Sequence, residues 1–388
     1  MLFRLIKASV LREVGKLSGR YVYIFSMIVI PLAGLFIMTS LMAGGLPMSV
    51  PTAVVDLDNT HETRAIVRQL EASPEIQVVS RPGSYAEALA QMRRGEIFGF
   101  FIIPADYTRD NLSGRDARLS YYTNSTFFVP ASLLYRGLKT NATVASADVV
   151  RAYLLENGST VDQAQAMLQP VHLQTNPLGN PWSNYAIYIC NSFVPALLAL
   201  MIHLVTAFSI CVEEKRGTSQ DWLDTAGGSI IVALFGKLLP QTIIFSAVGL
   251  FIQGYMFGFL HYPMNCSPWT MIFAMLLFVI ANQSVAVFVC GVIPNLRFAV
   301  SICTLYGVLT FSLGAFSFPA ESMYGAVSIF TWISPSRFYF LIYGDQALNG
   351  FDLYYSKVYF AALMVFNLLP WLTMVNLKKA QREPVYVP

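Results

Sequence analysis

Residues 185–212 read YAIYICNSFVPALLALMIHLVTAFSICV and contain no Asp, Glu, Lys or Arg. A bilayer core about 30 Å thick is crossed by about 20 helical residues, so this run is long enough to span a membrane. A helix is the form in which such a run satisfies its own backbone hydrogen bonds in lipid. The run therefore predicts a transmembrane helix.

Other apolar runs have the same character. They are residues 21–42, 230–260, 269–292, 298–318 and 354–377, and Pro31 predicts a kink in the first. The whole chain is 55% hydrophobic and 12% charged, and its net charge of +3 does not favour nucleic-acid binding. We predict a polytopic α-helical membrane protein with six transmembrane helices, three of them within residues 230–318.

Residues 319–353 are only partly apolar, and Pro335 interrupts them. We predict a re-entrant helical hairpin in the outer leaflet, because the stretch is too broken to cross the bilayer.

Basic residues in the short connecting segments set the expected orientation. If six spans alternate, one side of the membrane receives all of these residues: Arg4, Lys7, Arg12, Lys16, Arg20, Lys215, Arg216, Arg297, Lys378, Lys379 and Arg382. Short cytoplasmic loops are enriched in Lys and Arg. Both termini, including the tail 378–388, are therefore predicted to be cytoplasmic, and residues 43–184 to lie outside.

Residues 1–20 alternate in a helical pattern. Leu2, Ile6, Val10, Val14 and Leu17 form one stripe, and basic residues occupy the rest. This pattern is typical of a helix lying along the membrane surface. A loose basic leader that serves only topology remains an alternative.

The segment 43–184 predicts an inserted α/β domain. Strands are expected at residues 52–55, 76–79, 97–103 and 118–122, separated by helical stretches, and two helices broken at Gly158 should follow. This alternation favours a small, mostly parallel sheet covered by helices.

The sequence Asp56-Leu-Asp58-Asn-Thr60 follows the first expected strand. It is similar to the first motif of haloacid-dehalogenase phosphatases. That chemistry also needs a downstream Lys and a paired Asp to hold Mg²⁺ and phosphoryl charge, and the matching residues do not follow here. We interpret Asp56 as tying a turn and Asp58 or Thr60 as capping a helix.

Three weaker features lie in the apolar runs or near them. His203 is ionisable within a span, and we expect a neutral ring bonding to a neighbouring helix rather than a functional group. Gly254 and Gly258 form a G-x-x-x-G that permits close helix packing. The four histidines lack metal-ligand spacing, so no metal site is predicted. The phosphate-binding sequence G-x-x-x-x-G-K-[ST] does not occur.

Residues 213–229 form a charged cytoplasmic stretch after the second span. It contains Glu213, Gly217 and Thr218, is compatible with a helix after Gly217, and carries Trp222 among charges. An exposed Trp in such a place is typical of a protein-docking surface. A solvated loop with Trp222 at the lipid interface remains the alternative.

Two of these stretches resemble a known family. Residues 213–218 (EEKRGT) resemble the E-x-x-x-G-T element of ABC-2 type transporter permeases, and residues 236–240 (GKLLP) resemble the start of their next span. The segment 43–184 is similar to the domain inserted after span one in the multidrug-type branch. Residues 219–222 (SQDW) depart from the Leu-Glu-Gln-Leu-type continuation that is commoner there.

The resemblance implies an exporter subunit in the bacterial inner membrane, with ATP and Mg²⁺ held by a separate ABC ATPase and no cofactor in this chain. Glu213, Gly217, Thr218 and Trp222 would couple to that ATPase, and Pro319, Glu321 and Pro335 would belong to an outer gate. Further implied partners are a second copy or sibling permease, membrane lipid and an envelope or membrane-fusion protein. The implied cargo is a drug-like or lipid-like amphiphile.

Two rival classes remain. A membrane sensor with an outer ligand-binding domain would need a cytoplasmic signalling module, for which little chain follows the last span. A secondary transporter would be expected to show paired intramembrane charges.

Overall fold

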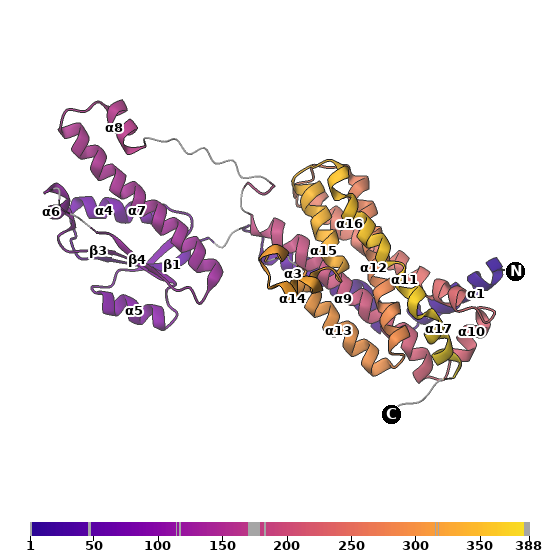
Figure 1. Cartoon of the computed structure of the whole chain (residues 1–388). Helices are drawn as coiled ribbons and strands as arrows, with labels where there is room; N and C mark the ends of the chain where they lie inside the picture. The colour runs from indigo at the N-terminus through magenta and orange to yellow at the C-terminus, as the bar shows by residue number, and fades with distance from the viewer. Residues whose placement is uncertain are drawn as a thin grey trace. The chain divides into compact units, whose positions relative to one another are not determined.

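The computed structural model describes residues 2–45, 48–113, 115, 118–169, 179–181, 184–314, 316 and 318–383. The chain divides into two compact units. Unit 1 comprises residues 1–45 and 177–388, and unit 2 comprises residues 46–176. Figure 1 shows the helices of unit 1 and the mixed helices and strands of unit 2.

Among the residues that the structure describes, five helical stretches of unit 1 are long and apolar enough to cross a membrane, with mean hydropathy between 1.8 and 2.3. They are formed by α2 (Tyr21–Ile24), η1 (Phe25–Val29) and α3 (Ile30–Leu41); α9 (Tyr185–Lys215); α11 (Ile230–Gln253) and η2 (Gly254–Phe259); α12 (Pro268–Val292); and α16 (Leu353–Phe366) with α17 (Leu369–Arg382). α9 packs against α3, α12 and α13, and is the most deeply buried of the five.

The predicted break at Pro31 appears as a change of helix type. The turn η1 is π-helical and directly precedes α3, in which Pro31 lies at the second position. A proline removes one backbone hydrogen bond and clashes with the carbonyl four residues earlier. The wider π-helical turn covers the residue four positions before Pro31, which is where that clash would occur.

The expected span at residues 298–318 is shorter than predicted. Its helix, α13, runs over Leu296–Leu313, 18 residues. At 1.5 Å per residue it is about 27 Å long, near the lower limit for a crossing helix. The chain ends the helix at Gly314, and the buried Phe316 accepts a hydrogen bond from Tyr188 Oη (2.5 Å) through its carbonyl, which draws the segment back to α9.

The hairpin predicted after this helix consists of short helical turns. They are η3 (Ala320–Ser322), α14 (Gly325–Thr331), α15 (Pro335–Ile342) and the π-helical η4 (Tyr343–Leu348). Pro335 occupies the first position of α15, where its missing N–H is not needed. The segment is helical, as expected, whereas the hairpin arrangement and its depth in a membrane stay predictions.

Unit 2 is a four-stranded sheet in the order β2-β1-β3-β4. Its strands are β1 (Val50–Asp56), β2 (Ile76–Ser80), β3 (Gly99–Ile103) and β4 (Ser120–Thr123). β1 is parallel to both β2 and β3, and β4 is antiparallel to β3. The expected small, mostly parallel sheet is confirmed.

Helices cover both faces of this sheet. α4 (His61–Glu71) and α7 (Phe128–Glu156) share one apolar core with the sheet, and α5 (Tyr85–Arg93) shares a second core on the other face (Figure 1). α6 (Tyr107–Leu112) follows β3. Gly158, with φ +86°, separates α7 from α8 (Val161–Leu168), as the sequence predicted.

The Asp-x-Asp-x-Thr motif forms a turn and a helix cap. Asp56 Oδ1 accepts hydrogen bonds from the backbone N–H groups of Asp58 (3.2 Å) and Asn59 (2.9 Å). Asp58 Oδ2 accepts from both the N–H (3.0 Å) and the hydroxyl (2.5 Å) of Thr108. Thr60 caps α4 in a capping box. The interpretation as turn and cap is confirmed, with Asp58 joining α6 and Thr60 capping α4.

Candidate functional site

The N-terminal helix α1 (Leu2–Ser18) packs along α11. Leu2 and Val14 of the predicted apolar stripe are exposed, as expected of a face turned to lipid, whereas Leu17 is buried. The close approach of the two helices depends on Gly236, because a Cβ there would lie 2.2 Å from Ser9 Cβ. Part of the polar face of α1 is turned to the protein: Glu13 is buried, and Arg12 and Lys16 turn to α9, whereas Arg4 and Lys7 are exposed.

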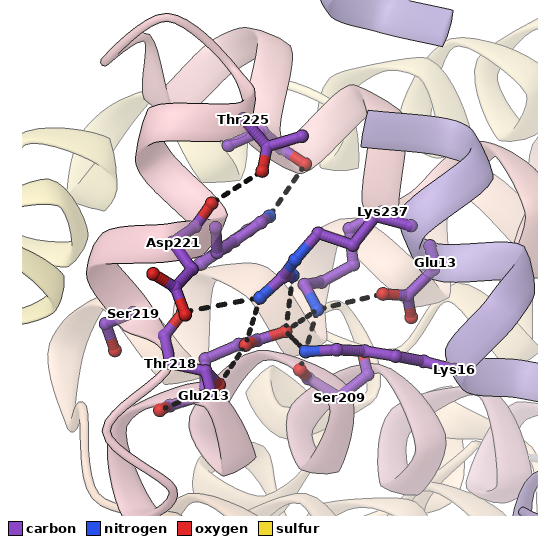
Figure 2. Close-up of polar contacts among 12 residues, drawn as sticks. Glu13, Lys16, Ser209, Glu213, Thr218, Ser219, Asp221, Thr225 and Lys237 are labelled. Atoms are coloured by element: carbon purple, nitrogen blue, oxygen red, sulfur yellow. Dashed lines mark hydrogen bonds and ion pairs between the residues drawn. The ribbon is translucent and has the colours of Figure 1, made fainter. Parts of the chain in front are cut away.

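Five charged side chains meet where α1, α9 and α11 join. We call Arg12, Glu13, Lys16, Glu213 and Lys237 the buried charge cluster (Figure 2). Its centre is Glu213, in the last turn of α9 and fully buried.

Glu213 binds three cations. Arg12 forms a bidentate pair with the carboxylate, with both N–O distances at 2.9 Å. Lys16 Nζ lies 2.5 Å and Lys237 Nζ 2.7 Å from Oε1. Bidentate guanidinium contacts are strong and directional, so the orientation of the Glu213 carboxylate is fixed.

Lys237 is the second fully buried member. Its ammonium donates to Glu213, to Glu13 Oε2 (3.0 Å) and to the Ser209 carbonyl (3.1 Å). These three acceptors use all three of its protons. The Trp222 ring lies 4.8 Å from the same Nζ, which adds a cation–π contact. Figure 2 shows Lys237 and Lys16 directed at Glu213, with Glu13 on the far side of Lys237.

The positive and negative charges of the cluster lie in direct contact with one another. Three cations face two carboxylates, and Glu13 receives a further hydrogen bond from Gln241 Nε2 (3.1 Å). Burial lowers the pKa of the Lys16 ammonium, although its hydrogen bond to Glu213 acts in the opposite direction. Removing one partner from such a buried pair leaves an uncompensated charge and costs about 3–5 kcal/mol. The cluster therefore fixes α1, α9 and α11 to one another.

The spacing Glu213-x-x-x-Gly217-Thr218 forms the joint between α9 and the next helix, α10 (Ser219–Thr225). Thr218 N donates to the Glu213 carbonyl (2.9 Å) and Gly217 N to the Glu214 carbonyl (3.0 Å), which is a Schellman C-cap. Gly217 has φ +68°, a conformation that favours glycine. The Thr218 hydroxyl then reaches Glu213 Oε2 (2.5 Å). The turn predicted at Gly217 and the helix after it are confirmed.

Trp222 is not the exposed docking residue that we predicted from the sequence. Its side chain is 1% exposed and its Nε1 donates to the Ala233 carbonyl (3.3 Å). An amphipathic seven-residue helix lying on α11 buries its apolar face, and Trp222 falls on that face with Leu223. The exposed side of α10 carries Gln220, Asp221 and Asp224 instead.

Glu213, which the family resemblance assigns to ATPase coupling, is not free for a partner. It lies at the C-terminal end of α9, and its carboxylate is occupied by residues of its own chain. α10 is also held at its other side, because Ser219 Oγ donates to Gln381 Oε1 (2.7 Å) in α17.

The remaining predicted residues lie away from the cluster. Gly254 and Gly258 are exposed in η2, where an added Cβ would meet no atom of the described chain within 4 Å, so no close packing occurs there within this chain. His203 is buried against Tyr306, with ring centroids 5.1 Å apart. Among the described residues neither ring nitrogen has a hydrogen-bond partner, so the predicted interhelical bond is wrong.

The hairpin residues Pro319 and Glu321 lie at η3, and Pro335 begins α15. Sequence reasoning missed Arg337, whose side chain donates to Thr331 Oγ1 and stacks 4.9 Å from the Trp332 ring. This arginine ties the two helices of the hairpin together.

Sequence reasoning also missed that Glu13 and Lys237 are paired. The available signal was their position, because an ionisable residue inside or beside an apolar run needs a partner. Nothing in the sequence states which partner it has.

Comparison with known proteins agrees with this architecture. A family model described as "ABC-2 family transporter protein" matches residues 21–374. No curated protein matches the chain.

Proposed function

Because the chain belongs to the ABC-2 family of transporters, we propose that it is the permease subunit of an ABC exporter, driven by a separate ATPase. The observation that carries this proposal is the junction of α10 with the buried charge cluster. Family membership supports transport over the sensor alternative.

In this proposal the ATPase docks on the exposed face of α10. Gln220, Asp221 and Asp224 form that face, and the two carboxylates call for basic residues on the partner. Trp222 acts indirectly, by fixing α10 on α11.

Movement of the docked ATPase reaches the membrane helices through the start of α10. Thr218 links α10 to Glu213, and Glu213 links it to α1 and α11 through Arg12 and Lys237. Ser219 adds a link to α17. A displacement of α10 therefore moves four helices together, which supports coupling of ATP binding to a change in helix packing.

The assembly that we propose contains two permease copies, or this chain with a sibling permease, and two ATPases. Unit 2 lies outside the membrane and both termini inside, with α13 as a sixth span. The cargo is an amphiphile, drug-like or lipid-like, moved outward past the hairpin at Pro335, and an envelope or membrane-fusion protein can join the outer side.

Orientation is tested by cysteine labelling in intact cells. A membrane-impermeant reagent should modify a Cys replacing Asp148 in α7 and spare one replacing Gln220 in α10, with the wild-type chain as background. The reverse pattern would overturn the orientation.

Docking is tested by co-purification of the ATPase with Asp221→Lys and Asp224→Lys. Asp148→Lys, the same charge change on exposed unit 2, is the matched control. We expect loss of ATPase from both α10 variants, with unchanged thermal unfolding. Equal ATPase retention in all variants would remove α10 as the docking element.

A further inference from the structure

Unit 2 contains a pocket that the proposed transport mechanism does not use. It has a volume of about 410 Å³ and lies between β1, α4 and the segment after β2. Its lining includes the last residue of β1, Asp56, and residues that directly follow β2. The carboxyl ends of parallel strands are the edge at which open α/β sheets bind ligands.

Three guanidinium groups line this pocket, which we call the arginine pocket. They belong to Arg64 and Arg68 of α4 and to Arg81 after β2. The apolar side chains of Val54 and Val67 also line it, and both are buried. The lining therefore combines cationic and apolar side chains.

Two of the three arginines, Arg64 and Arg68, have no acidic partner within the described part of the chain. Among the described residues Arg64 donates to Asn59 alone, through Nε and Nη2 at 3.2 Å each, which orients the guanidinium without cancelling its charge. Arg81 has one ion pair, with Glu71 (2.6 Å). Within the described part of the chain, Arg68 has no hydrogen-bond or ion-pair partner.

Both carboxylate oxygens of Asp56, the acidic residue in the lining, accept hydrogen bonds from neighbouring residues of the turn and of α4. Its Oδ1 accepts from Asp58 N and Asn59 N, and its Oδ2 accepts from Thr63 Oγ1 (2.8 Å). Each guanidinium has five N–H donors, so most donors of the three arginines remain available. Arg64 and Arg68, which have no acidic partner within the described residues, give the pocket an excess of positive charge, and a bound anion would offset it.

We propose that the arginine pocket binds the phosphate group of a small organic molecule. Guanidinium groups match phosphate oxygens bidentately, and a phosphate can carry enough charge to neutralise more than one of them. The volume is in the range of ligand pockets, larger than a bare phosphate requires, and the apolar lining at Val54 and Val67 accommodates the organic part. The proposal does not depend on the transport role.

Two sources share this chemistry: a soluble phosphate ester and a phospholipid headgroup. The soluble arm titrates glycerol 3-phosphate into the full chain in non-ionic detergent by calorimetry at fixed ionic strength. The lipid arm compares thermal unfolding of the full chain in phosphatidylcholine nanodiscs with and without phosphatidic acid.

Arg68→Gln and Arg64→Gln are the test variants. Arg93→Gln is the matched control, because Arg93 is an exposed arginine of α5 outside the pocket. We expect saturable binding of glycerol 3-phosphate, or stabilisation by phosphatidic acid, by the wild type and Arg93→Gln. Each pocket variant should lose about tenfold or more in affinity, or most of the stabilisation, as expected for a lost charge-assisted hydrogen bond.

A response in the first arm assigns a soluble ester, and a response in the second arm alone assigns a headgroup. The absence of a response in both arms overturns the proposal. An equal loss in Arg93→Gln also overturns it, because the effect would then come from overall charge.

Discussion

Lys237→Met tests whether the buried charge cluster holds the helices of unit 1 together. Methionine keeps the length and apolar character of the lysine stem and removes the ammonium. Glu213 retains Arg12 and Lys16, but within the described part of the chain Glu13 retains a single hydrogen bond, from Gln241. A buried carboxylate without its cation is the costly product of this substitution.

The expected loss is about 3–5 kcal/mol in the free energy of unfolding, the range for breaking a buried ion pair on one side. It corresponds to roughly two to three and a half orders of magnitude in the unfolding equilibrium constant. The cation–π contact with Trp222 adds to the loss. Lys215→Met removes a lysine that is exposed at the end of α9 and should change stability little.

A second substitution separates charge balance from packing. Glu13→Gln in the Lys237→Met background removes the orphaned carboxylate, so the double variant should recover most of the lost stability. The assay is thermal or denaturant unfolding of the four chains of this cycle in one detergent. Wild-type stability of Lys237→Met, or absence of recovery in the double variant, would refute the electrostatic account.

Three further outcomes are expected. Gly236→Ala should destabilise α1 against α11 by about 1–3 kcal/mol, because the added Cβ overlaps Ser9, and Ser9→Gly should restore part of the loss in an unfolding assay. Trp222→Ala should cost about 3–5 kcal/mol of stability, since it empties a buried site, and a variant that unfolds like the wild type yet releases the ATPase would contradict this. Gly217→Asn should retain ATPase coupling and Gly217→Val should lose it, because Asn tolerates a positive φ and Val does not. A Cβ at this position meets no atom of the described chain within 4 Å, so the two variants should differ only in backbone strain. Equal ATPase coupling in both variants would show that backbone strain is not the cause.

Secondary-structure elements with a regular pattern of apolar residues were predictable from the sequence. The long apolar runs predicted six transmembrane helices, and five helices of spanning length are found among the described residues. The alternation in residues 52–122 predicted the sheet of unit 2. Both predictions rest on local geometry, because the spacing of apolar residues along the chain follows the period of a helix or a strand. The contact of Phe316 with Tyr188 beyond the end of α13 was not predictable, because it depends on a helix more than 100 residues away in the sequence.

The orientation of single side chains was not predictable in the same way. Trp222 lies among charges in the sequence, which favours exposure, but a seven-residue helix packed on α11 turns it inward. Glu213 and Lys237 were each visible within a motif, whereas their pairing requires the fold. Glu13, from a helix expected only at the membrane surface, completes the cluster from the other end of the sequence.

The Schellman joint decides how α10 can act. A helix connected by a loop can tilt without moving its neighbours, but Gly217 and Thr218 bind the end of α9 through two backbone bonds and the Thr218 hydroxyl binds Glu213 itself. α10 and the end of α9 are therefore expected to move together as one rigid unit. In the proposed mechanism, a displacement of Asp221 or Asp224 by the ATPase is passed to Glu213, because no flexible loop separates α10 from the end of α9. The same carboxylate is bound by Arg12, Lys16 and Lys237, so the displacement is shared by α1 and α11. The motif spacing thus places Glu213, the carboxylate bound by three cations, at the joint between α9 and α10.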